Sequence, residues 1–318
     1  MTALLLAVAL AAVVAALIAN AKAYVRRAES RWPPLGRFID SGGARIHITE
    51  AGPPDAPRLL LIHGASANLR ELWGPLAELT RDFRVIAYDR PGMGHSTRAR
   101  RGAATLASQA RVAADVLAAT GDGPAIVVGH SLGAAVALRV ALDHPKLVAG
   151  IVATAPACNP YEGNNAWWVR LSAMPLLGHA FCAALIPSIG PLVARSGIAN
   201  NFMPASAPSN YYDDGGVGLI FRPRAFRSSA LDVAATKSEF AAQAPRYPEI
   251  FAPAIVITGE KDRIVSPKRH ARRLASELPA AELVIAPSAG HMPHRIRPDL
   301  VIAAIRRVNA MASQPAER

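Results

Sequence analysis

The stretch AIVVGHSLG at residues 125–133 limits the possible folds of this chain more than any other. Its four leading apolar residues predict a short buried strand, and the run AAVAL at 134–138 predicts a helix directly after it. Ser131 lies between them in a Gly-x-Ser-x-Gly pattern. A sharp turn from strand to helix leaves no room for side chains beside the serine, which explains Gly129 and Gly133. The turn lifts the Ser131 hydroxyl clear of the sheet and points a helix N-terminus at the reacting oxygen, so we expect a nucleophile.

Short apolar runs alternate with helix-forming segments through most of the chain. The leucine-rich run 58–62 predicts a strand buried on both faces, and the pattern over 38–40 and 44–50 predicts an antiparallel hairpin. Further strands are expected at 84–88, 147–153, 254–258 and 283–286, and helices at about 68–79, 104–119, 267–278 and 298–311. This order indicates an α/β fold with a mostly parallel central sheet covered by helices on both faces.

The alternation breaks between about residues 155 and 250, where aromatic residues and prolines accompany short helical pieces. We interpret this segment as an α-helical lid inserted into the sheet domain. The resulting division is an N-terminal anchor at 1–22, a linker at 23–36, core segments at 37–154 and 251–312, the lid at 155–250 and a tail at 313–318.

The first residues are strongly apolar. Ala3–Ala19 contains only alanine, leucine, valine and isoleucine, and no charge appears before Lys22. This length is just sufficient to span a hydrocarbon core of about 30 Å. Met1-Thr2 lacks the basic region of a signal peptide, which favours an uncleaved membrane anchor, although cleavage-like triplets at 19–23 keep secretion or a periplasmic location as the alternative. The basic residues that follow place the catalytic domain on the cytoplasmic side: Lys22, Arg26, Arg27 and Arg31.

The chain carries a formal charge of +12, which raises the question of nucleic-acid binding. The basic residues occur in short scattered groups without a nucleic-acid motif, so we expect no nucleic-acid partner and a solvated surface attracted to anionic lipid. The main groups are Arg26-Arg27, Arg98/Arg100/Arg101, Arg222/Arg224/Arg227, Lys268/Arg269/Arg272/Arg273 and Arg306-Arg307.

Two cysteines, Cys158 and Cys182, are too few for a disulfide framework; two packed thiols are favoured over a single bridge.

A serine nucleophile needs a base to take its proton and an acid to orient that base. In strand–turn–helix sites of this kind the chain order is serine, acid, histidine. Asp262 follows the strand at 254–258, and His291 follows the strand at 283–286 directly after a glycine. We therefore expect His291 as the base and Asp262 as the acid. The competing residues are His294 for the base, and Glu260 or Glu162 for the acid.

The developing oxyanion needs two preorganised donors. The backbone N–H of Leu132, directly after the nucleophile, is one, and the N–H of Ala65 in the loop after the 58–62 strand is the other. We interpret His63, His95 and His130 as hydrogen-bonded structural histidines, because no metal-ligand spacing relates them. No metal and no cofactor are expected.

With these residues in place, the sequence resembles the α/β-hydrolase fold superfamily, in the branch with a lid between the sixth and seventh strands. The resemblance extends from about Gly36 to Met311 and depends on His63-Gly64, DRPGMGHS at 89–96, the Ser131 turn, GEKD at 259–262 and Gly290-His291. It implies a hydrolase but does not select the substrate. Similar dehalogenases and epoxide hydrolases use an aspartate nucleophile, and Ser131 at that place argues against both activities.

The expected reaction is hydrolysis of small-molecule carboxylic esters with hydrophobic acyl groups through an acyl-enzyme. The alternative is C–C bond hydrolysis of aromatic-ring cleavage products, for which Arg222, Arg224 or Arg227 would bind a carboxylate. A catalytically silent binding module on the same fold is the third hypothesis. Protein partners are not indicated by the sequence.

Overall fold

The computed structural model describes residues 1–99 and 104–314. An eight-stranded sheet, in the order β1-β2-β4-β3-β5-β6-β7-β8, forms the centre of the molecule. Only the pairings of β2 with β1 and β4 are antiparallel. The strands are β1 (Arg37–Ser41), β2 (Ala44–Ala51), β3 (Arg58–Ile62), β4 (Arg84–Tyr88), β5 (Ala125–His130), β6 (Val148–Thr154), β7 (Ala254–Gly259) and β8 (Ala281–Ala286). The mostly parallel sheet is confirmed.

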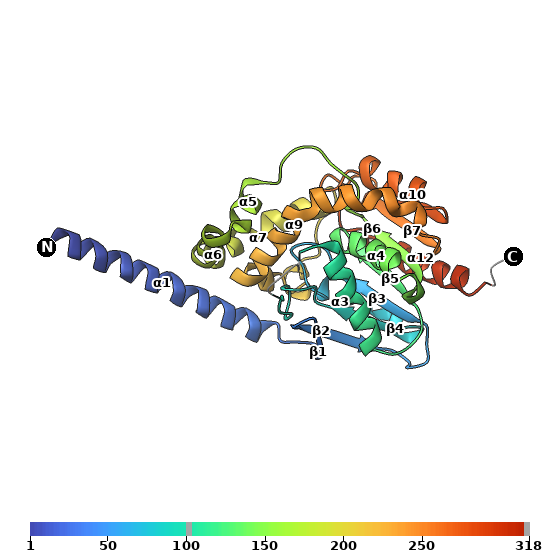
Figure 1. Ribbon diagram of the computed structural model, residues 1–318, viewed down its shortest axis with the longest axis horizontal. Coiled ribbons are helices and arrows are strands. Elements are labelled where there is room, and N and C mark those ends of the chain that lie inside the picture. The colour runs from blue at the N-terminus through green and yellow to red at the C-terminus, as the bar shows by residue number, and fades with distance from the viewer. Residues whose placement is uncertain (100–103, 315–318) are drawn as a thin grey trace.

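Helices cover both faces of this sheet (Figure 1). One face packs against α3 (Leu106–Ala119), α4 (Leu132–Asp143) and α10 (Arg273–Glu277). The other packs against α2 (Arg70–Trp73), the 3-10 helix η1 (Ala77–Arg81) and α12 (Pro298–Ala312). Strand β3 shows why both faces need cover, because Leu60 and Ile62 join the first core and Leu59 and Leu61 the second. The short helices η2 (Pro145–Leu147) and α11 (Pro293–Ile296) complete the core segments.

Two predicted helices differ from the observed elements. The helix expected at 68–79 is divided into α2 and η1, because Gly74-Pro75 interrupts it. The helix expected at 267–278 begins with the π-helical turn η5 (Lys268–Arg272) before α10. The hairpin of β1 and β2 and the remaining strands lie within two residues of their predicted positions.

Residues between β6 and β7 form an inserted helical segment, here called the insertion (155–250). It contains α5 (Trp167–Ala173), α6 (Pro175–Ala184), α7 (Ile186–Phe202), α8 (Tyr211–Asp214), η3 (Val217–Phe221), α9 (Pro223–Gln243) and η4 (Ala244–Glu249). Its longest helix, α9, is bonded to the core at several points along its length. The Asp232 carboxylate pairs with the fully buried Arg90, and Ser229 Oγ accepts a hydrogen bond from the Ser66 N–H.

Helix α1 (Thr2–Arg31) is one continuous helix of 30 residues whose first half projects away from the rest of the molecule (Figure 1). It is long and apolar enough to cross a membrane, with a mean hydropathy of 2.6 over an 18-residue window that is only 6% buried. Helices α6 and α7 pass the same test as a pair bent by 72°. Residues 23–31 of the expected linker are thus helical, and the tail at 313–318 is described only as far as residue 314.

The second half of α1 packs against the insertion. Ala28 and Trp32 are buried beside Leu219 of η3. The Tyr24 hydroxyl donates to the Gly218 carbonyl, and Trp32 Nε1 donates to the Asp213 carbonyl. These contacts fix the direction of α1 relative to the folded domain.

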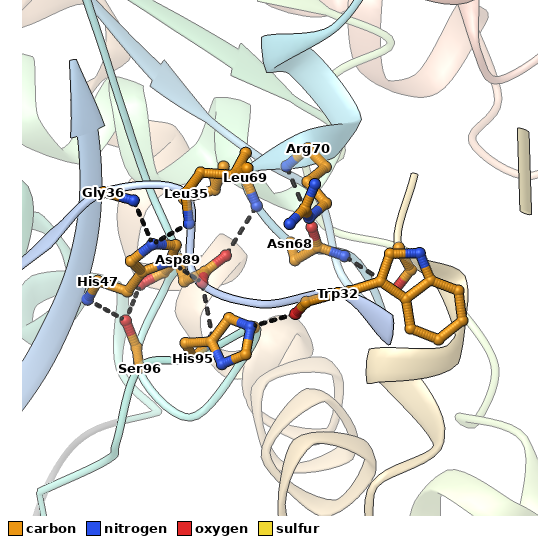
Figure 2. A network of polar contacts seen from close by, with 12 residues as sticks. Trp32, Leu35, Gly36, His47, Asn68, Leu69, Arg70, Asp89, His95 and Ser96 are labelled. Atoms are coloured by element: carbon orange, nitrogen blue, oxygen red, sulfur yellow. Dashed lines mark hydrogen bonds and ion pairs between the residues drawn. The ribbon is translucent and has the colours of Figure 1, made fainter. Parts of the chain in front are cut away.

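A buried polar network connects the end of α1 to the core (Figure 2). His95 Nε2 donates to the Trp32 carbonyl at 2.8 Å. His47 Nε2 accepts the N–H groups of Leu35 and Gly36, so its proton is on Nδ1 and is donated to Asp89. Burial opposes ionisation of Asp89, but His47, His63 and the His95 N–H together outweigh it and lower the pKa of the carboxyl. The segment 32–36, which follows α1, is therefore held to the core at both ends, by His95 at Trp32 and by His47 at Leu35 and Gly36.

Candidate active site

Ser131 lies at the turn between β5 and α4 with φ 51° and ψ −119°, a strained conformation for a residue other than glycine. A Cβ on Gly129 would collide with the backbone of Gly133 and Ala134. A Cβ on Gly133 would collide with the carbonyls of Ile62 and His63. The close approach of three chain segments therefore requires both glycines, and the elbow has the geometry predicted from its sequence.

Ser131, His291 and Asp262 form one hydrogen-bonded chain. The Ser131 hydroxyl lies 3.0 Å from His291 Nε2, and His291 Nδ1 lies 2.8 Å from Asp262 Oδ2. The other carboxylate oxygen of Asp262 accepts the N–H groups of Ile264 and Val265, at 2.8 and 2.9 Å. Both oxygens of the acid are thus occupied, and its plane is fixed relative to the imidazole. This arrangement can carry a proton from Ser131 to His291 while a carboxylate faces the ring.

The backbone of His291 is held on both sides. Its N–H donates to the carbonyl of Asn201 in α7, and its carbonyl accepts a hydrogen bond from His130 Nε2 at 2.9 Å. Gly290 precedes it in a position where a Cβ would collide with the Met203 carbonyl. The insertion therefore helps to position the expected base.

The competing candidates lie elsewhere. His294 is fully buried, and neither of its ring nitrogens forms a hydrogen bond with any residue that the structure describes; its Nε2 lies 3.8 Å from Glu71 Oε1. Glu260 is exposed beside Lys261, and Glu162 is exposed in the insertion. Of the predicted acids and bases, the structure brings only Asp262 and His291 to Ser131.

The backbone N–H groups of Ala65 and Leu132 are candidates for an oxyanion hole. Within the described ranges, neither N–H donates to another residue. The loop that carries Ala65 lies against the elbow, because a Cβ on Gly64 would be 3.2 Å from Ser131 Cβ. Arg90 holds this loop by donating to the carbonyls of His63 and Gly64, both at 3.0 Å. Two unused donors thus flank the serine: the Leu132 N–H at the start of α4 and the Ala65 N–H on a loop that a buried guanidinium holds.

Comparison with known proteins agrees with this geometry. The sequence profile of the α/β hydrolase fold family matches residues 57–298, well over half of the chain. The chain belongs to the α/β hydrolase fold family. The match begins at the edge of β3 and ends at the start of α12, so it includes the elbow, the insertion and the loops that carry Asp262 and His291.

Relatives of this hydrolase differ in substrate. It is 28% identical, over 85% of its own length and 94% of the relative, to 2-(acetamidomethylene)succinate hydrolase of Mesorhizobium japonicum. Its fold resembles that of 2-hydroxy-6-oxo-6-phenylhexa-2,4-dienoate hydrolase from Rhodococcus sp. strain RHA1, with a TM-score of 0.72, 21% identity and coverage of 87% and 98% of the two chains. It also resembles a membrane phospholipase A, with a TM-score of 0.65, 21% identity and coverage of 99% and 100%. These structural likenesses show the fold.

Behind Ser131 of this hydrolase lies a buried cluster that the sequence did not reveal: Glu71, His130 and His294. Glu71 bonds to His130 Nδ1, and His130 Nε2 faces the His291 carbonyl. Both ring nitrogens of His130 therefore face acceptors and carry protons. Burial disfavours charge on His130, but Glu71 outweighs it and raises the pKa of the imidazole. Burial likewise opposes ionisation of Glu71, yet His130 lowers the pKa of its carboxyl below the ordinary range.

The cluster has the residue types of a metal site, with one potential ligand atom from each residue and all three atoms within 4.8 Å of one another. However, Glu71 and His130 are bonded directly to each other, which leaves no space for an ion between them. The geometry is that of a buried ion pair. Burial also lowers the pKa of the neighbouring His294, so this ring is neutral beside the pair.

The other histidines discussed for the sequence are hydrogen-bonded, as predicted: His63 accepts the Arg90 N–H on Nε2, and His95 donates to Trp32. The two cysteines are separate buried thiols.

A cavity beside α1 is lined by Arg222, Arg224 and Arg227, and Ser131, Asp262 and His291 do not contribute to its lining. The carboxylate-binding role that the C–C hydrolase hypothesis gives these arginines therefore has no geometric support at the serine.

Proposed function

We propose that this α/β hydrolase cleaves carboxylic esters with hydrophobic acyl groups through an acyl-enzyme on Ser131. The observation that carries the proposal is the chain from Ser131 Oγ to His291 to Asp262, at 3.0 and 2.8 Å, beside two unused backbone N–H groups. A serine, an oriented imidazole and an oxyanion hole are the parts that acyl transfer to water requires.

In the proposed mechanism, Ser131 Oγ attacks the ester carbonyl carbon as its proton passes to His291 Nε2. The N–H groups of Ala65 and Leu132 stabilise the oxyanion of the tetrahedral intermediate, each by about 3 kcal/mol. His291 then protonates the departing alkoxide, which leaves the acyl group on Ser131. A water molecule gives its proton to His291 and attacks the acyl carbonyl; as the second intermediate collapses, His291 returns this proton to Ser131 Oγ and the carboxylic acid is released. Asp262 keeps the imidazole in the required tautomer throughout.

The surroundings support lipid-like substrates. The insertion, which we treat as a lid, exposes large apolar side chains on α5, α6 and α7: Trp167, Leu176, Leu177, Ile189, Leu192 and Val193. Solvent-exposed groups of this kind are typical of a surface that meets apolar material. Asn20 of α1 bonds to Ser188 in the same region, so this surface adjoins the apolar helix.

We propose that α1 anchors the chain in a membrane with the catalytic domain on the cytoplasmic side, and a fold shared with a membrane phospholipase A is consistent with an anchored enzyme.

The first experiment is active-site labelling with a fluorophosphonate, followed by a series of p-nitrophenyl esters of increasing acyl length and a dienoate substrate. Wild type should be labelled and should favour the longer esters. Ser131→Ala should lose the label and at least about 10³-fold in kcat, whereas the exposed Ser276→Ala should retain both. Absence of label on wild type would favour a silent module, and turnover of the dienoate alone would favour C–C hydrolysis.

Membrane location is tested separately. Alkaline carbonate extraction should leave the full-length chain in the membrane pellet, because an 18-residue apolar window is not released by removal of peripheral contacts. A soluble form trimmed near residue 21 would instead support secretion after signal cleavage.

A further inference from the structure

A cavity of about 1180 Å³ lies where α1 meets the insertion and the loop after β4. Side chains from α1, α6, α9 and residues 92–98 line it. Its lining contains seven lysine or arginine residues and one carboxylate, that of Glu29: Lys22, Arg26, Arg45, Arg98, Arg222, Arg224 and Arg227. Of the basic group at 98–101, Arg100 and Arg101 lie outside the described residues. The cavity is thus strongly cationic.

The chain neutralises only part of this charge. Arg222 is bonded through all three of its guanidinium nitrogens, to Glu29 and to the carbonyls of Leu219 and Gly94. Glu29 is thereby already paired. The exposed side chains of Arg26 and Arg224 bond to no other residue in the described part of the chain.

Two arginines in the wall also carry buried N–H groups without acceptors. Arg98 donates through Nη2 to Ser228 and Asp232, but its Nε and Nη1 have no acceptor among residues 1–99 and 104–314. Arg227 donates through Nη2 to the Met174 carbonyl, and its Nε is likewise unpaired. Buried donors without acceptors cost free energy. An anion with several oxygen atoms supplies the negative charge that this cavity lacks and gives acceptors to the exposed guanidinium groups of Arg26 and Arg224.

The position of the cavity along α1 selects the source of the anion. The uncharged part of α1 ends at Ala21, and the cavity is lined by Ala21, Lys22, Val25, Arg26 and Glu29. At about 1.5 Å of rise per residue, Lys22 and Arg26 are about 6 Å apart along the helix. The headgroup layer on each side of a hydrocarbon core has a similar thickness. An anchored α1 thus places these cations at the level of the lipid phosphates.

We propose that this cavity binds the phosphate of an anionic phospholipid in the leaflet that holds α1. The lipid assignment rests on the membrane location in the proposed function; the affinity for a phosphate-bearing anion does not. The basic side chains of the cavity come from different parts of the chain, since Arg224 and Arg227 belong to the insertion and Arg98 to the core. A bound lipid therefore attaches the insertion and the core to the membrane at a second point, beside α1. The headgroup thereby ties anchor, insertion and core together at the membrane surface.

The test uses the full-length chain in mixed micelles and counts bound lipid by native mass spectrometry. Ser131→Ala is the background, so that lipid is not consumed. Phosphatidylglycerol should bind in preference to zwitterionic phosphatidylcholine. Arg26→Gln/Arg224→Gln should weaken phosphatidylglycerol binding at least tenfold, given about fivefold for each basic side chain near an anionic surface. Arg269→Gln/Arg272→Gln removes the same charge from η5, which does not line the cavity, and should bind as the parent does.

Three results would overturn the proposal: equal binding of the two lipids, unchanged binding in Arg26→Gln/Arg224→Gln, or an equal loss in the η5 variant. A separate arm adds inorganic phosphate and glycerol 1-phosphate. If either displaces phosphatidylglycerol at a matching concentration, the ligand is a soluble phosphate and the lipid assignment is wrong. Ester hydrolysis by the wild-type chain is measured in parallel. Hydrolysis without lipid selectivity defeats only this inference, and lipid selectivity without hydrolysis defeats only the proposed function.

Discussion

Replacement of Glu71 by glutamine tests the buried ion pair behind the elbow. Glu71 is 3% exposed and bonds to His130, whose second nitrogen holds the His291 carbonyl. Removal of one partner from a buried ion pair costs about 3–5 kcal/mol, because the other charge remains without compensation. His130 can relieve part of this cost by losing its proton, but a neutral ring has one donor for two acceptors. We therefore expect Glu71→Gln to lower the free energy of unfolding by about 3 kcal/mol.

The pH dependence of this loss follows from the two pKa shifts. The pKa of His130 is raised above 6.5, so its contribution to stability is complete below pH 6.5 and is lost as the pH rises through the raised value. The pKa of Glu71 is lowered from 4.5, so its contribution is complete above pH 4.5 and is lost as the pH falls through the lowered value. The difference in stability between wild type and Glu71→Gln should be largest between pH 4.5 and 6.5 and should shrink in alkaline solution.

Urea unfolding of the full-length chain in detergent, followed by tryptophan fluorescence at about pH 5.5 and about pH 8.5, measures both effects. Glu78→Gln is the matched control, since this carboxylate is exposed and lies 3.8 Å from Arg306. It should change stability by no more than about 0.5 kcal/mol. Equal effects of the two variants, or a larger loss for Glu71→Gln at alkaline pH, would refute the charged state assigned to His130.

Three further predictions concern the site and its surroundings. Asp262→Asn should lower kcat by about 10³–10⁴-fold with little change in KM, because the amide favours the wrong imidazole tautomer; steady-state kinetics on a p-nitrophenyl ester measure both. Gly129→Ala should abolish fluorophosphonate labelling of soluble protein or prevent folding, because its Cβ collides with the backbone of residues 133 and 134, and labelling at wild-type level would contradict this. Native Cys158 should resist iodoacetamide until urea is added, because burial raises the pKa of its thiol far above the ordinary value and excludes the reagent; peptide mass spectrometry detects the adduct.

The elbow was predictable because its determinants are local. A strand, two glycines and a helix within nine residues specify where Ser131 points, and the structure brings Asp262 and His291 to it from the loops where the chain order places them. The choice between Asp262 and Glu260 depended on the direction of each side chain after β7. Sequence order alone left that choice open, whereas the N–H groups of Ile264 and Val265 determine it in the structure.

The Glu71 cluster was not predictable in the same way. Glu71 is 59 residues from His130, on a helix of only four residues, and nothing local distinguishes it from an exposed carboxylate. The length of α1, by contrast, left a signal that the predicted linker overlooked. Residues 23–31 contain no glycine or proline, and six of the nine are arginine, alanine or glutamate, which favours continuation of the helix as far as the prolines at 33 and 34.

The continuity of α1 changes how anchor and active site are related. A flexible linker would let the catalytic domain turn freely above a membrane, but α1 is bound to the insertion through Asn20, Tyr24 and Trp32. The same insertion supplies the Asn201 carbonyl that holds the His291 N–H. The helix that would enter the bilayer and the base that would activate Ser131 are therefore linked through packed helices rather than through loose chain. On this geometry, the orientation of α1 in a membrane also sets the orientation of the elbow toward it.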